Sequence, residues 1–162
     1  MQPNRPGPFA ALVLFGFILC LGPAPASAAG GPLGRWLTED NDGVVEIDRC
    51  GGAALCGRIV GVTLDRPTDP EPRDVYGRPI CGLTIITSAE QTGPDVWTGH
   101  ITNPKNGKIY NAQISIDAVG RLHLRGYVGL PLFGETVVWH PFEGRIGEHC
   151  HIGSVEGEVS GF

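Results

Sequence analysis

The sequence predicts an all-β protein, a small antiparallel barrel of eight strands. Apolar residues recur with a period of two along most of the chain, which is typical of half-buried strands. Turn residues separate these runs, and no helical crossover lies between them. Short strands joined by hairpins pair antiparallel, and eight of them can close a small barrel or form a sandwich.

The first three strands are short apolar runs, and the last ends near Trp139. The first run contains Trp36, the second reads VVEI and the third GRIVGV. Each is bounded by glycine or charged residues, as strands in small β domains are. In chain order, the expected strands span 33–39, 44–49, 55–62, 83–87, 96–103, 109–117, 121–128 and 135–140.

The clearest alternation lies in the sixth and seventh expected strands. Asn106-Gly107 precedes the sixth, and Val119-Gly120 lies before the seventh, as hairpin turns require. One face of each strand is therefore expected to be buried. That face comprises Tyr110, Ala112, Ile114 and Ile116 in the sixth strand and Leu122, Leu124, Gly126 and Val128 in the seventh.

Two segments lack this pattern. Prolines and charged residues fill Thr63 to Gly82, which predicts a long loop. Loops of this length in compact domains are often lids or binding loops, although a solvated excursion is the simpler interpretation. Residues 143–162 are glycine-rich and predict a partly ordered tail.

The first 28 residues have the layout of a secretory signal peptide. Arg5 precedes an apolar run from Phe9 to Leu21, and PAPASA follows, so we expect cleavage near Ala28. The run is shorter than the roughly 20 residues of a membrane-spanning helix. The sequence thus predicts a periplasmic or secreted protein with a barrel domain over 29–142, not one that spans a membrane.

Four cysteines remain after the signal peptide. In an oxidising compartment, an even number favours disulfides. Cys50 and Cys56 flank an expected hairpin with five residues between them, so we expect them to pair. Cys81 and Cys150 then remain as a second candidate pair, which would tie the long loop to the tail.

The charge of the chain excludes some partners. The formal net charge is −5, and no basic run is present. Nucleic acids and anionic membranes attract basic surfaces, so neither is expected to bind this protein.

Several different short motifs are distributed along nearly the whole mature chain. They are Gly34-Arg35-Trp36, Val45-Glu46-Ile47, Cys50 with Leu55-Cys56-Gly57, Pro79-Ile80-Cys81-Gly82-Leu83, Asn103-Pro104 with Gly107-Lys108 and Tyr110, Leu124-Arg125-Gly126-Tyr127-Val128-Gly129, and Trp139. Together they resemble the bacterial DUF2147 family, small exported proteins with no assigned function. The resemblance implies a family and an exported location, and it implies no activity.

A second resemblance concerns the first strand. Its Gly34 and Trp36 are similar to the Gly-x-Trp of calycins, the lipocalin-like barrels, in which the tryptophan closes one end. This resemblance implies a lipocalin-like or calycin-like barrel. Trp97 and Trp139 are expected to pack in the core as well, because large rings in small barrels more often fill space than stack on a ligand.

Four polar residues are candidates for ligand binding: Asn103, Lys108, Arg125 and Tyr127. Near a barrel mouth, their amide, ammonium, guanidinium and phenol groups would orient an acidic or amphipathic guest. The alternative is that the segment around Asn103 is only a turn, which needs its asparagine, proline and glycine for backbone reasons.

Neither a cofactor nor a metal is expected. In His149-Cys150-His151, neighbouring side chains of an extended segment point to opposite sides, and two histidines alone do not make a structural metal site. The chain has no nucleophile motif, no His-Glu-x-x-His and no phosphate loop, so we do not expect an enzyme.

Two functions remain. In the first, the barrel binds a small apolar or amphipathic ligand in its interior. In the second, side chains fill the barrel, and the protein is a cell-envelope interaction or structural module. Inward volume favours the first and an exposed apolar patch the second. The small residues expected inside are Gly57, Gly99, Ala112 and Gly126, beside the larger Trp97 and Tyr110.

Overall fold

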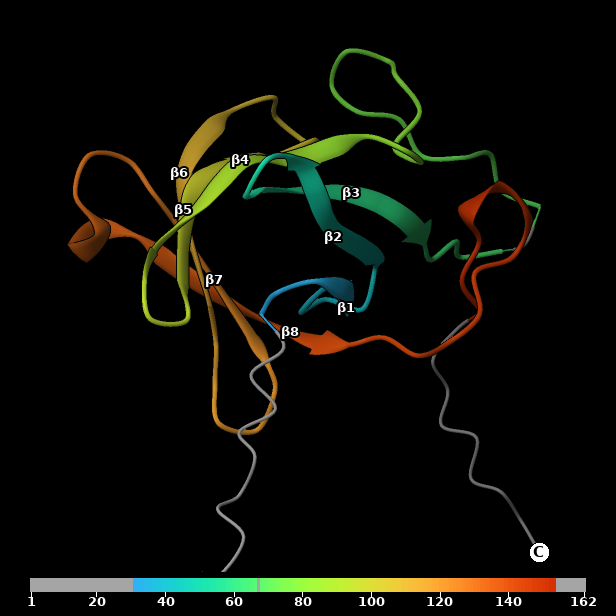
Figure 1. Cartoon of the computed structure of the whole chain (residues 1–162). Coiled ribbons are helices and arrows are strands. Elements are labelled where there is room, and N and C mark those ends of the chain that lie inside the picture. Colours follow the sequence, from blue (N-terminus) through green and yellow to red (C-terminus); the bar gives the residue numbers. More distant parts are fainter. Residues whose placement is uncertain (1–30, 67, 154–162) are drawn as a thin grey trace, which may run out of the picture.

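The computed structural model describes residues 31–66 and 68–153, and over these the chain forms a closed antiparallel barrel of eight strands (Figure 1). This confirms the predicted fold class. The strands are β1 (Gly34–Leu37), β2 (Gly43–Gly51), β3 (Ala54–Val62), β4 (Thr84–Gly93), β5 (Val96–Thr102), β6 (Ile109–Ile116), β7 (Leu122–Tyr127) and β8 (Glu135–Pro141).

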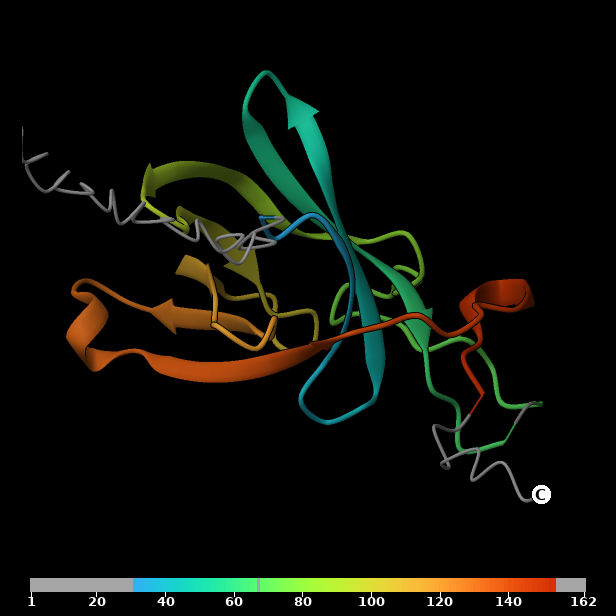
Figure 2. The same cartoon turned by 60° about the horizontal axis from the view of Figure 1, so that its bottom comes forward.

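The strands pair in chain order, and β1 closes the barrel against β8. Trp36 pairs with Pro141 and Leu37 with His140. Successive turns therefore alternate between the two ends of the barrel: the β1–β2 turn and the β2–β3 turn lie on opposite sides in Figure 2. Each strand therefore has a neighbour on both sides.

All but one of the strand ends lie within two residues of the expected ones, and two of the differences change the expected pairing or burial. β4 continues to Gly93 rather than ending at residue 87, because the pairing with β5 shifts register between Thr87 and Glu90. Such an irregularity interrupts the period of two, so the second half of β4 does not continue the pattern of the first. β7 ends at Tyr127, and Val128, expected on the buried face, is exposed.

Side chains fill one end of the barrel. Trp36 is buried, and its indole N–H donates to the carbonyl of Pro32 at 2.8 Å. Trp97 is buried too and packs against Gly31, where a Cβ would lie 3.0 Å from the indole. The two tryptophans therefore close this end together with the segment that precedes β1. They are joined in the core by Ile47, Leu55, Ile86, Ala89, Ala112, Ile114 and Leu122.

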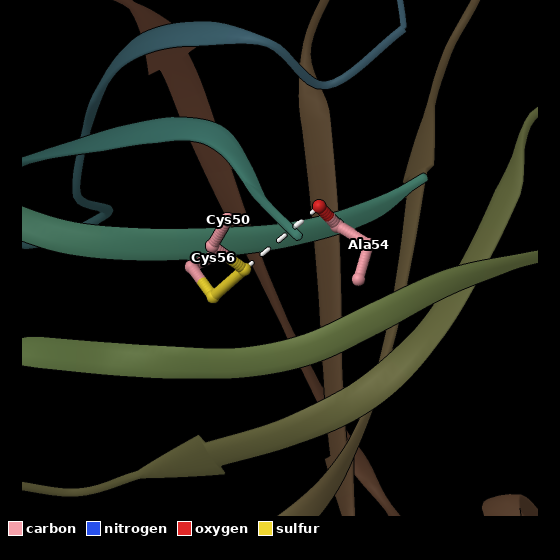
Figure 3. Close-up of a disulfide and its surroundings, with 3 residues drawn as sticks. All are labelled: Cys50, Ala54 and Cys56. Carbon is pink, nitrogen blue, oxygen red and sulfur yellow. Dashed lines mark hydrogen bonds between the residues drawn. A yellow bond between two sulfur atoms is a disulfide. The ribbon is translucent and has the colours of Figure 1, made fainter. Parts of the chain in front are cut away.

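Both predicted disulfides are present. Cys50–Cys56 joins β2 to β3 beside their hairpin, with a Cα–Cα distance of 5.6 Å (Figure 3). Cys81–Cys150 links the long β3–β4 loop to the segment after β8, with a Cα–Cα distance of 5.9 Å. Within the part of the chain that the structure describes, no helix is long and apolar enough to cross a membrane.

The segment after β8 packs on the outside of the barrel. Ile152 donates its N–H to the carbonyl of Val62 at 3.0 Å and is buried with Leu37 and Val44. A short 3-10 turn, η2 (Glu148–Cys150), precedes it. The described part of the expected tail, up to Gly153, is therefore anchored by the disulfide and by this apolar cluster. The expected signal peptide lies outside the described residues.

Candidate ligand cavity

The other end of the barrel is hollow and open. A cavity of about 790 Å³ reaches from the barrel interior to the loops at this end. Its wall is mostly aliphatic and aromatic, and every strand from β2 to β8 contributes to it. The inward residues are Val45, Ile59, Ile85, Ile101, Tyr110, Leu124, Val137 and Trp139.

The volume has a different origin from the one expected. Gly57 and Gly99 leave no space, because a Cβ there would lie 2.8 Å from Ile86 and 2.7 Å from the backbone of Ala89. Ala112 also lies outside the cavity lining, whereas Gly126 belongs to it. A Cβ on Gly126 would meet only the Cβ of Tyr110, at 4.0 Å. Gly126 is therefore the expected small residue that opens the cavity.

Four connections form the rim. They are the β1–β2 turn, the β3–β4 loop, the β5–β6 turn and the β7–β8 loop, which all begin at this end of the barrel. The long loop contributes Pro72 and Ile80, whose backbones are joined by a hydrogen bond of 3.0 Å. The segment from Thr63 to Gly82 is thus part of the cavity wall.

Asp74 organises this long loop, a role that the sequence analysis missed. It is buried and accepts hydrogen bonds from the backbone N–H groups of Tyr76 and Arg78 and from the guanidinium of Arg78, at 2.7 to 2.9 Å. Burial alone would raise its pKa, but these hydrogen bonds and the charge of Arg78 outweigh burial and lower it. Asp74 therefore remains ionised within the loop.

The long loop also docks on the β5–β6 turn. The N–H of Val75 donates to the carbonyl of Pro104 at 3.0 Å. The Tyr76 ring covers Gly107, where φ is +70° and a Cβ would lie 2.6 Å from the phenol oxygen. Glycine is needed there both for its backbone conformation and for this contact.

Acidic side chains dominate the charge of the rim. The cavity lining includes the carboxylates of Glu39, Asp40, Asp42 and Glu135. Lys105 is the basic residue of the lining, and its Nζ lies 3.5 Å from Asp42. The lining as described therefore carries more negative than positive charge.

The structure brings two of the four candidate binding residues to the cavity. Asn103 and Tyr127 belong to its lining. Asn103 also serves the turn, since its side-chain oxygen accepts the N–H of Lys105 at 2.8 Å. Lys108 is exposed and lies outside the lining, where Lys105 provides the ammonium instead. The turn begins at Asn103-Pro104, so Lys105 follows the end of β5 directly. This position in the sequence is the signal that Lys105, rather than Lys108, lies near the mouth.

Arg125 also lies outside the lining. It alternates with the inward Leu124 and holds the β7–β8 loop from the outer face of the barrel. Its guanidinium donates to the carbonyls of Pro131 at 2.7 Å and Leu132 at 3.3 Å. A third hydrogen bond, of 2.8 Å, goes to the hydroxyl of Thr136. The guanidinium is thus engaged within the protein.

Cys150, the centre of the His149-Cys150-His151 motif, is bonded to Cys81. A disulfide sulfur is not a thiolate, and thiolate is the form in which cysteine binds a metal. Among the residues that the structure describes, no three His, Cys, Asp or Glu side chains are grouped to hold a metal ion.

Comparisons with known proteins agree with this architecture. The barrel resembles a solved structure of protein HP1028 from Helicobacter pylori, described as belonging to the lipocalin family. The likeness has a TM-score of 0.58 at 15% sequence identity and covers 68% of this chain and 82% of the other. No curated protein matches the chain. The model of an uncharacterised family conserved in bacteria matches residues 34–141, from the start of β1 to the end of β8, and the chain therefore belongs to the DUF2147 family.

Proposed function

We propose that this protein binds a small apolar or amphipathic molecule in the open half of its barrel. The supporting observation is the cavity of about 790 Å³ with its aliphatic and aromatic wall. Cavities of roughly 300 to 1,000 Å³ are typical of small-molecule sites. The lipocalin-like fold adds support by analogy, since a fold alone does not determine a function.

The rim favours one end group over another. An apolar body in the barrel would place the polar end of the ligand near Glu39, Asp40 and Glu135. These carboxylates attract a cationic end group and repel an anionic one. We therefore infer a neutral or cationic amphiphile rather than an acidic one, in contrast to the acidic guest that Lys108 and Arg125 would orient.

An exported location accords with this function. Both disulfides require an oxidising compartment to persist, and the family is bacterial. We infer that the protein acts in the periplasm, after loss of the expected signal peptide, as a binding protein rather than an enzyme.

Native mass spectrometry of the protein purified from its own periplasm tests the proposal. We expect a population heavier than the chain by one small molecule, released under denaturing conditions. A Nile red titration complements it, because this neutral dye fluoresces in apolar sites. If neither a co-purified molecule nor dye binding is found, the proposal is wrong.

A cavity-filling variant locates the binding. In Gly126→Leu the new side chain extends into the cavity, where a Cβ meets no atom closer than 4.0 Å. We expect at least about tenfold weaker dye binding, because a ligand would lose contact area. Gly93→Leu is the matched control, since Gly93 also lies in a strand and has space for a Cβ but lies outside the cavity lining. Equal effects of the two variants would contradict binding in the barrel.

A further inference from the structure

The β7–β8 connection is an exposed apolar loop. We call residues 128–134, with the sequence VGLPLFG, the rim loop. It includes the short 3-10 turn η1 (Pro131–Phe133) and projects from the barrel at the left edge of Figure 1. Val128, Leu130, Leu132 and Phe133 are 64% to 78% exposed. So many large apolar side chains in one short loop mark an interaction surface.

Part of the backbone of the rim loop is hydrogen-bonded within the protein. Phe133 donates its N–H to Leu130 at 3.1 Å, and Gly134 donates to Pro131 at 3.0 Å. Arg125 donates to the carbonyls of Pro131 and Leu132. Proline itself has no N–H group. The carbonyls of Leu130, Pro131 and Leu132 and the N–H groups of Phe133 and Gly134 therefore keep their partners when water is removed, which lowers the cost of placing the tip of the loop against hydrocarbon.

The loop continues into the cavity. Val128 and Phe133 are exposed and also line the cavity mouth. Seven consecutive residues without an ionisable side chain lie next to the rim carboxylates, Glu135 being the residue that follows. An apolar tip beside negative charge complements a bilayer surface, in which hydrocarbon lies beneath a layer of positively charged ammonium groups. It does not complement an anionic surface.

We propose that the rim loop docks on a lipid bilayer with zwitterionic headgroups. Leu130, Leu132 and Phe133 enter the acyl-chain boundary, and the carboxylates of the rim face the headgroup ammonium ions. A protein groove would also bury the apolar side chains, but the position of the loop beside the cavity mouth and the rim carboxylates favours a bilayer, which holds both amphiphiles and ammonium groups. Docking brings the cavity mouth to the surface where an amphiphile resides.

Vesicle flotation of the mature protein tests this proposal. We expect binding to phosphatidylcholine vesicles, and weaker binding when phosphatidylglycerol replaces part of the phosphatidylcholine. Leu130→Glu and Leu132→Glu should each weaken vesicle binding at least about tenfold, because a charge replaces an inserted side chain. Val119→Glu is the matched control, as Val119 is 74% exposed in the β6–β7 turn at the other end of the barrel.

Leu132→Trp provides an optical readout. The three natural tryptophans are buried, so a blue shift on vesicle addition that the wild-type protein does not show reports the introduced indole. Leu130 and Leu132 lie outside the cavity lining, so their Glu variants should still bind Nile red, and the test is independent of the proposed ligand. Docking is excluded if vesicles do not bind, if anionic vesicles bind better, or if Val119→Glu loses as much. A protein partner captured through Leu132 without any vesicle binding excludes it too.

Discussion

The Nε atom of Arg125 donates a hydrogen bond of 2.7 Å to the carbonyl of Pro131, six residues further along the chain. This contact fixes the rim loop to the strand that it leaves. The charged residue therefore faces away from the cavity while controlling the shape of the cavity mouth through Phe133, which belongs to the same turn.

Loss of this contact should loosen the rim loop. In Arg125→Ala, three hydrogen bonds are removed, and we expect the free energy of unfolding to fall by about 1 to 2 kcal/mol. Amide hydrogen exchange of Phe133 and Gly134 should accelerate more than that of β6. Arg125→Lys should restore little of this, because an ammonium cannot reproduce the guanidinium fork. Arg49→Ala, at an exposed position on β2, is the control and should leave hydrogen exchange in the rim loop unchanged. Equal exchange rates of Phe133 and Gly134 in the two alanine variants would show that Arg125 does not hold the loop.

The two disulfides should have separable effects. In the chain-entropy model, Cys81–Cys150 stabilises the fold by about 4 kcal/mol and Cys50–Cys56 by about 2 kcal/mol, because their separations are 69 and 6 residues. Urea unfolding of the paired serine variants measures both. Cys81→Ser with Cys150→Ser should also weaken Nile red binding, since Ile80 lines the cavity beside Cys81. Cys50→Ser with Cys56→Ser should leave Nile red binding unchanged. Equal loss of dye binding in the two paired variants would show that the long loop has no specific part in forming the cavity.

Asp117 should make stability depend on pH. The backbone N–H of Arg121, the imidazole of His123 and the Arg121 guanidinium hold the pKa of Asp117 well below its ordinary value of 3.8. Because the native pKa lies below that of the unfolded chain, the contribution to stability is complete above about pH 3.8 and is lost as pH falls through the native pKa.

Asp117→Asn should therefore lower the melting temperature at neutral pH, and the difference from the wild type should shrink under acid conditions. Calorimetry across this range measures it. Asp48→Asn is the control, since Asp48 is exposed and makes no side-chain hydrogen bond within the described residues. If the difference in melting temperature between the wild type and Asp117→Asn is the same at every pH, the lowered pKa of Asp117 is contradicted.

The rim charge should select between ligands of equal chain length. Dodecylamine should bind more tightly than dodecanoate, by several-fold, because each exposed charge pair contributes about 0.2 to 1 kcal/mol. The double variant Asp40→Asn with Glu135→Gln should bring the affinities for dodecylamine and dodecanoate closer together, and raised salt should do the same. Displacement of Nile red measures both affinities. A preference for the carboxylate would contradict the inferred ligand class.

The barrel could be predicted from the sequence because its strands alternate locally. The residues of β6 and β7 needed only a period of two and glycine turns to be assigned. The end of β4 could not be predicted, since its register shift against β5 depends on a partner strand. Gly99 illustrates the same limit: its inward position was expected, but the backbone of β4 fills the space.

The site was harder to predict from the sequence than the barrel, for a similar reason. Asn103 and Tyr127 could be expected at a barrel mouth from strand ends alone. Arg125 could not be excluded, because its partners are the carbonyls of a loop whose conformation the sequence does not specify. Asp74 carries no sequence pattern that distinguishes it from Asp65 and Asp69 of the same loop, and only its hydrogen bonds in the structure do so.

The division of the barrel into a filled end and a hollow end has a consequence for change by mutation. Trp36, Ile86 and Leu122 carry the packing, and none of them lines the cavity. A substitution at a position such as Gly126 can therefore alter what the barrel accommodates without disturbing the residues that hold it closed. Such a scaffold is suited to acquiring new specificities, by natural drift or by laboratory selection, from one stable foundation.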